Sequence, residues 1–122
     1  MEAQPQPVRK QLQAADLEEA MMRIEQAIAI APPGIQPELM DTKAQVLLAG
    51  GNEEEALRVI EEAIKIAPTR LDLRIRAIRI LVDLGRTTQA RTLAEQSLAL
   101  TRAYRFQREL VEQLRQLIEE IS

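Results

Sequence analysis

The sequence predicts an all-α protein made of repeated helical hairpins, and three observations lead to that prediction. A pattern of turn and small residues recurs at a fixed interval, with Gly51 repeated 34 residues later as Gly85 and Ala63 repeated as Ser97. Within each unit, apolar residues recur at steps of three and four, which is the period of a helix. Aromatic residues make up only 2% of the chain, so the core must be filled by small and aliphatic side chains, a composition that favours helix packing over a sheet.

The chain of 122 residues, 46% of them apolar, fits a single domain with one continuous core. Its apolar spacing predicts seven helices, near residues 7–14, 16–30, 37–49, 53–66, 70–83, 87–101 and 104–121. These form three antiparallel pairs, in repeats of about 1–34, 37–70 and 71–104, followed by a capping helix of about 105–122. Gly50 and Gly51 are predicted to end a helix and form a turn, and the Pro-rich stretch 31–37 must break a helix.

The second unit carries the clearest pattern, with small, large and turn residues at Met40, Ala44, Leu47, Gly51, Ala56, Ile60, Ala63 and Pro68. In this pattern the chain resembles the tetratricopeptide repeat family over about 100 of its 122 residues. The resemblance implies a right-handed solenoid of helical hairpins in which the small residues lie where paired helices cross closely.

The outer units depart from the family pattern. The third unit has Arg102 where Pro is expected, which leaves open whether the last two helices are separate or form one bent rod. In the first unit, Gln4, Pro7 and Gln11 replace expected apolar residues. Two explanations remain open for this unit: the chain is part of a longer array, or a partner covers the helix predicted at 16–30. The last helix has an apolar stripe at steps of three and four and a polar face opposite to it: the stripe is Leu110, Val111, Leu114, Leu117, Ile118 and Ile121, and the polar face is Glu112, Arg115, Gln116, Glu119 and Glu120. This helix is either a solvating cap or a docking helix, and the cap is favoured.

The residue types present exclude most catalytic and metal sites. The chain has no Cys and no His, so it cannot build Cys/His zinc sites, Ser-His-Asp or Cys-His nucleophiles, or His general bases. Its paired carboxylates are adjacent on helices and point about 100° apart, so they do not converge on one substrate atom. We therefore predict no enzyme activity and no catalytic, cofactor or metal site.

Charge is unevenly distributed along the chain. Residues 1–68 carry 6 basic and 12 acidic side chains, whereas residues 69–108 carry 9 Arg and only 3 acidic residues. Three interpretations of the cluster at Arg70, Arg74, Arg76 and Arg79 were weighed: solvated or internally paired Arg, an acidic-peptide site, and a nucleic-acid site. The first is favoured and nucleic acid is disfavoured, because the net charge is −3 and aromatic stacking residues are scarce.

The resemblance also implies a concave groove lined by the first helices of successive units. Seven positions correspond to it: Asp41, Gln45, Leu48, Asp72, Ile75, Arg79 and Val82. Such a groove would be acidic at one end, apolar along its floor, and equipped with an Arg that can grip a carboxylate. A clamp for the C-terminal tail of heat-shock chaperones is disfavoured, because Asp41 and Gln45 stand where that pattern needs Lys or Asn.

The sequence therefore predicts a protein-interaction module, acting as an adaptor, assembly factor or chaperone for a protein or peptide of unknown identity. The alternative is a self-assembling element in which the acidic first half of one copy meets the Arg-rich third unit of another. No apolar run approaches the roughly 20 residues that cross a bilayer, so no membrane partner is expected. A cytoplasmic location is expected, and the 13 Arg against 3 Lys suggest a bacterial source.

Overall fold

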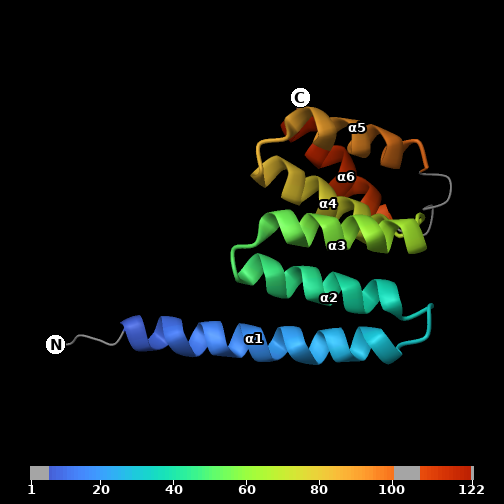
Figure 1. Ribbon diagram of the computed structural model, residues 1–122. Helices are drawn as coiled ribbons and strands as arrows, with labels where there is room; N and C mark the ends of the chain where they lie inside the picture. The colour runs from blue at the N-terminus through green and yellow to red at the C-terminus, as the bar shows by residue number, and fades with distance from the viewer. Residues whose placement is uncertain (1–5, 101–107, 122) are drawn as a thin grey trace.

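The computed structural model describes residues 6–100 and 108–121, with side chains described from residue 14 onward. Over these residues the chain forms six helices and no strand, which confirms the all-α fold. The helices are α1 (Gln6–Ile30), α2 (Gln36–Ala49), α3 (Glu53–Ile66), α4 (Leu71–Asp83), α5 (Thr87–Leu98) and α6 (Arg108–Ile121). Figure 1 shows α1 to α5 stacked in chain order, with α6 behind α4 and α5.

The first predicted hairpin is absent. The separate helices predicted at 7–14 and 16–30 are wrong, because α1 is one continuous helix of 25 residues. No Pro or Gly occurs between residues 8 and 31, and Ala14 and Ala15 are strong helix formers, so nothing in this stretch interrupts the backbone hydrogen bonds. The N-terminal part of α1 extends beyond the end of α2 (Figure 1). The described fold is thus two hairpins, α2 with α3 and α4 with α5, flanked by one helix at each end.

The turns of the two hairpins have the same geometry. In the first turn, the N–H of Gly51 donates to the carbonyl oxygen of Leu48 (3.0 Å) and the N–H of Asn52 donates to that of Leu47 (2.8 Å). The turn at Gly85 repeats both hydrogen bonds, at 2.9 and 2.8 Å. This pair of bonds is the Schellman motif, which needs a left-handed residue, and the φ angles of the two glycines are +80° and +78°. The predicted 34-residue interval is therefore confirmed in backbone geometry.

Small residues of the repeat pattern are fully buried between the helices. Seven of them are 0% exposed: Ala44, Ala56, Ala63, Ala77, Ala90, Ala94 and Ser97. The Ser97 hydroxyl donates to the carbonyl oxygen of Leu93 (2.7 Å) and accepts from Nη1 of Arg74 (3.3 Å), so its burial leaves no polar atom unsatisfied. Around these small residues pack the large aliphatic residues, among which Ile60, Leu73 and Ile78 are also 0% exposed.

The C-terminal helix closes the stack. Helix α5 ends at Leu98 instead of residue 101, and the predicted start of the last helix at residue 104 lies outside the described residues. Helix α6 packs against both α5 and α4, so the last two helices are separate and do not form one bent rod. Leu114 is 0% and Leu117 is 8% exposed, which buries the predicted apolar stripe of this helix against the second hairpin. Helix α6 therefore lies beside α4 as the first helix of a further repeat would.

Candidate functional site: the groove of α2, α4 and α6

The predicted groove residues on α2 form a small polar group. Nε2 of Gln45 donates to Oδ2 of Asp41 at 3.2 Å, one helical turn away. Gln45 is exposed, whereas Leu48, one turn further along, is only partly exposed and packs against the core. This end of the groove therefore offers an exposed amide and a partly covered aliphatic side chain.

An ion pair that the sequence analysis missed joins the first helices of the two hairpins. The guanidinium of Arg76 on α4 donates through Nε to Oδ1 of Asp41 and through Nη2 to Oδ2, the latter at 3.3 Å. The carboxylate side chain is 16% exposed and the arginine side chain 34% exposed. Asp41 is thus neutralised within the chain, and this part of the groove is less acidic than predicted. The sequence signal for this pair was two opposite charges separated by one repeat plus one residue.

Asp72 is also paired within the chain. Nε of Arg70 donates to its Oδ1 (3.0 Å) and Nη2 to its Oδ2 (2.7 Å), a two-pronged contact that suits the planar guanidinium. The hydrogen bonds from Arg70 lower the pKa of Asp72, against the opposing effect of partial burial. Arg74 donates to the carbonyl oxygen of Pro68 at 2.7 Å. Internal pairing, the favoured interpretation of the arginine cluster, is confirmed for Arg70, Arg74 and Arg76.

A small cavity of about 160 Å³ lies between α4 and α6. Ile75 is only 3% exposed and forms part of its wall, so this predicted groove residue contributes buried apolar surface. Nη2 of Arg79 donates to Oε1 of Gln113 on α6 at 3.4 Å, near the upper limit for a hydrogen bond. The cavity is lined by Asp72, Ile75, Arg76, Arg79, Leu110 and Gln113.

A larger cavity of about 480 Å³ follows at the far end of α4. Arg79 lies in the walls of both cavities, and Val82, 40% exposed, lines only the larger one. The cavity is completed by the first residue of α5 and the last turns of α6, and its lining is Arg79, Val82, Asp83, Thr87, Leu117, Glu120 and Ile121. Its volume is within the range of sites that hold ligand-sized groups, about 300–1,000 Å³.

The sequence analysis missed the contribution of α6 to the groove. It assigned Leu117 and Ile121 to the core-facing stripe and Glu120 to the opposite, polar face, yet all three line the larger cavity. Helix α6 packs against α4. The edge between the apolar face and the polar face of α6 therefore lies along the cavity. This contribution of α6 could have been predicted by treating the last helix as the first helix of another repeat.

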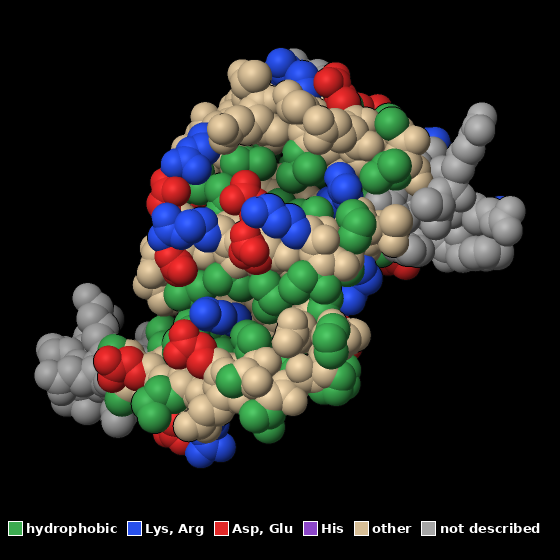
Figure 2. Space-filling model, turned by 45° about the vertical axis from the view of Figure 1, so that its right-hand side comes forward, with side chains coloured by type: hydrophobic (Ala, Val, Ile, Leu, Met, Phe, Trp, Pro, Cys, Tyr) green, Lys and Arg blue, Asp and Glu red, His purple; other side chains and the backbone are tan. Residues whose placement is uncertain are grey.

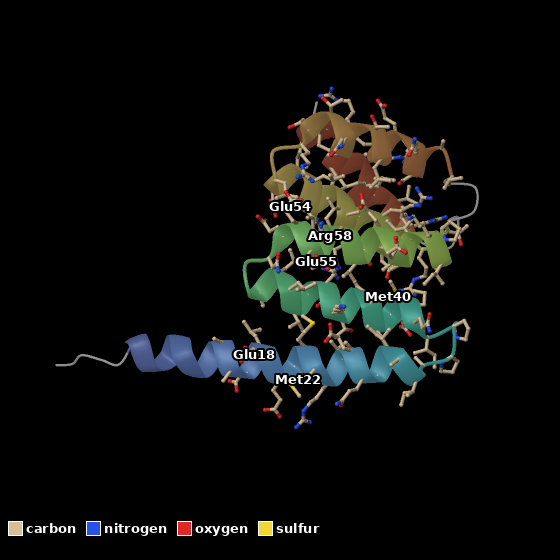
Figure 3. All side chains as sticks on the ribbon, in the orientation of Figure 1. Glu18, Met22, Met40, Glu54, Glu55 and Arg58 are labelled. Carbon is tan, nitrogen blue, oxygen red and sulfur yellow. The ribbon has the colours of Figure 1, made fainter. Side chains whose placement is uncertain are left out.

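Outside the groove, several charged side chains form ion pairs on the helix surfaces. Arg58 pairs with Glu55 one turn earlier on α3, and Arg86 pairs with Glu54, linking the two hairpins. Figure 3 shows Glu54, Glu55 and Arg58 together on α3, and Figure 2 shows charges of both signs interleaved across one face. No group of three or more carboxylates among the described residues is placed to hold a metal ion. Within the same residues, no helix is both long enough and apolar enough to span a membrane.

Comparison with known families agrees with this architecture. A family model described as tetratricopeptide repeat matches residues 47–115, which is more than half of the chain. The chain belongs to the tetratricopeptide repeat family. The match begins near the end of α2 and ends within α6, so it spans the second hairpin and both turns with left-handed glycines. It excludes α1, the helix that replaces the expected first hairpin. No curated protein matches the chain.

Tetratricopeptide repeats generally mediate interactions between proteins, and the family is typically not enzymatic. This family membership supports the coarse prediction of a protein-binding domain. The seven predicted groove residues lie on α2 and α4 as expected, but they differ in access. Gln45, Arg79 and Val82 are exposed, Asp41 and Asp72 are ion-paired, and Leu48 and Ile75 are partly or fully buried.

Proposed function

We propose that this domain holds an extended or helical segment of another protein in the groove formed by α2, α4 and α6, as an adaptor, assembly factor or chaperone. The observation that carries the proposal is the cavity of about 480 Å³ between α4 and α6, because it combines exposed apolar surface at Val82 with a charged group at Arg79. A side chain of the partner can enter this cavity while the rest of the segment lies along α4 toward α2. Aliphatic burial then supplies affinity, and the polar groups set the orientation.

Arg79 is the groove arginine best placed to bind a carboxylate of the partner. Arg70 and Arg76 are bonded to carboxylates of the chain itself, whereas Arg79 has a neutral partner at 3.4 Å. Its guanidinium can exchange that weak contact for a charge-assisted hydrogen bond, which is shorter and about twice as strong.

Arg79→Glu is expected to leave the fold intact and to weaken an acidic peptide ligand about tenfold or more, since it replaces an attraction by a repulsion. Fluorescence anisotropy with a labelled acidic peptide measures the affinity, and far-UV circular dichroism monitors the fold. Arg58→Glu is the matched control, because Arg58 is equally basic but lies on α3, paired with Glu55. Equal affinity of the wild type and of Arg79→Glu for the acidic peptide would show that Arg79 is not part of the binding groove.

Self-association is a second candidate, and the exposure of α1 favours it. No side chain of residues 14–30 is fully buried. Met22 on α1 is 60% exposed on the side away from α2 (Figure 3), and Ile30 is 87% exposed. A second copy that covered this helix would bury these side chains. Association between the acidic first half of one copy and the Arg-rich third unit of another has less support. Six arginines of the basic segment form hydrogen bonds within the chain: Arg70, Arg74, Arg76, Arg79, Arg86 and Arg91.

Light scattering after size exclusion, at several protein concentrations and two salt levels, separates these possibilities. The groove proposal expects a monomer throughout. An oligomer that dissociates at high salt would indicate association between charged surfaces, because salt screens exposed charges. An oligomer that resists salt would indicate burial of the apolar side chains of α1 instead.

A further inference from the structure

The larger cavity lies where α4 ends. Helix α4 ends at Asp83, and its last turn lines the cavity together with residues 117–121 of α6. The C-terminus of a helix carries a partial negative charge, which favours a cation nearby and disfavours a carboxylate. Yet the last turn of α4 places Asp83 in the cavity wall, and α6 adds a second carboxylate, Glu120.

These two carboxylates have no partner within the described part of the chain. Ion pairs or hydrogen bonds involve Asp41, Asp72, Glu54 and Glu55, but none involves Asp83 or Glu120. Arg91 donates to the backbone carbonyl oxygen of Ile121 at 3.1 Å rather than to Glu120. An unpaired acidic group at the C-terminus of α4 lowers stability slightly, which is the kind of cost found at binding sites.

The rest of the lining is suited to an aliphatic chain. Val82, Leu117 and Ile121 supply apolar wall, and Thr87 supplies a hydroxyl. Among the described residues, Arg79 is the one basic side chain in the lining, beside the two carboxylates of Asp83 and Glu120. A side chain with an aliphatic stem and a cationic head matches this arrangement, because Lys and Arg bury their methylene groups against apolar surface and keep their charge at a polar rim.

We infer that the cavity binds a lysine or arginine side chain of the partner segment, with the stem against Val82, Leu117 and Ile121 and the charged head at Asp83 and Glu120. The inference rests on the proposed function and specifies the chemistry of its ligand. Arg79 lies on α4 one helical turn before Asp83 and lines the same cavity, so it can bind an acidic residue of the segment close to the basic one. The favoured segment therefore carries a basic residue with an acidic residue close to it. Such a charge pattern would orient the segment along α4.

The test uses three amphipathic 14-residue peptides with leucine anchors that are identical except at one central position, which is Lys, norleucine or Glu. Norleucine keeps the aliphatic stem and removes the charge. Each peptide is titrated into the isotopically labelled protein and followed by amide chemical shifts. The Lys peptide is expected to bind about fivefold tighter than the norleucine peptide, the effect of one or two partly exposed ion pairs. Its shifts are expected to centre on residues 82–87 and 117–121.

The double variant Asp83→Asn with Glu120→Gln is expected to abolish the preference for Lys, so that the Lys and norleucine peptides bind it with equal affinity. Glu119→Gln is the control for the α6 half of the double variant, since it removes one carboxylate from the same turn of α6 but lies outside the cavity lining, and it should keep the preference. The double variant should also melt at or slightly above the wild-type temperature, because it removes the Asp83 carboxylate from the C-terminus of α4.

Equal affinity for the Lys and norleucine peptides, tighter binding of the Glu peptide, or no binding of any peptide would each overturn the inference. Groove binding of the norleucine peptide without a preference for Lys would overturn it while leaving the proposed function in place. A different result would overturn the proposed function itself: a polypeptide partner that contacts the domain without touching α2, α4 or α6.

Discussion

Leu114→Ala is expected to lower the free energy of unfolding by about 2 to 5 kcal/mol, the usual range for removing a large aliphatic side chain from a packed core. Leu114 is 0% exposed and lies in the middle of α6, where that helix packs against α4 and α5. The cost combines the lost burial with the cavity left behind, since rigid neighbouring helices cannot fully collapse into the gap. Because α6 closes the C-terminal end of the described stack, its loosening would expose the second hairpin as well.

Urea unfolding followed by circular dichroism measures this change. Gln116→Ala is the control on the same helix, where the side chain is exposed and the expected change is within about 0.5 kcal/mol. If both variants unfold at the wild-type midpoint, α6 is not part of the core. In that case it also cannot form the second wall of the two cavities.

Ala63→Leu is expected to destabilise the domain by about 1 to 3 kcal/mol through overpacking. Ala63 is 0% exposed on α3, at one of the positions where the repeat requires a small residue. Helices approach closely there, so three additional carbon atoms must push the hairpin apart or force strained rotamers.

Glu61→Leu provides the comparison, because it places the same leucine two residues away on an exposed position of α3. Its expected effect on the midpoint of thermal unfolding is small. A wild-type midpoint of thermal unfolding for Ala63→Leu would mean that the small-residue positions of the repeat were assigned to the wrong face. The groove positions, which were derived from the same repeat register, would then be wrong as well.

The two hairpins were predictable because local signals and the repeat agree. Gly51 and Gly85 need the left-handed conformation that ends α2 and α4, and the alanines one turn into α3 and α5 mark the close crossings. The error in α1 arose from reading a weakly apolar stretch as a break between helices. Helix continuity depends on the absence of Pro and Gly, whereas apolar content decides only whether a helix is buried.

The site was predictable only in part, because tertiary packing decides which groove positions are accessible. The repeat register correctly places Ile75 and Val82 on the same helix, but α6 covers the first and leaves the second 40% exposed. The pairing of Asp41 with Arg76 likewise depends on the distance between two first helices, which the sequence of either helix does not contain. For α6, Arg102 stands where the family pattern has Pro, so the sequence left open whether this helix is separate from the one before it.

The most direct test of the central claim is site-specific photo-crosslinking in cells that express the protein. A benzophenone amino acid placed at Gln45 or Val82 samples the groove, and the same group at Thr92 samples α5, whose exposed Thr92 lines neither groove cavity. The account predicts a crosslinked polypeptide at the two groove positions and none at Thr92, with the Val82 adduct reduced by Arg79→Glu. Crosslinks from Thr92 alone would contradict the account, because the partner would then bind outside the groove.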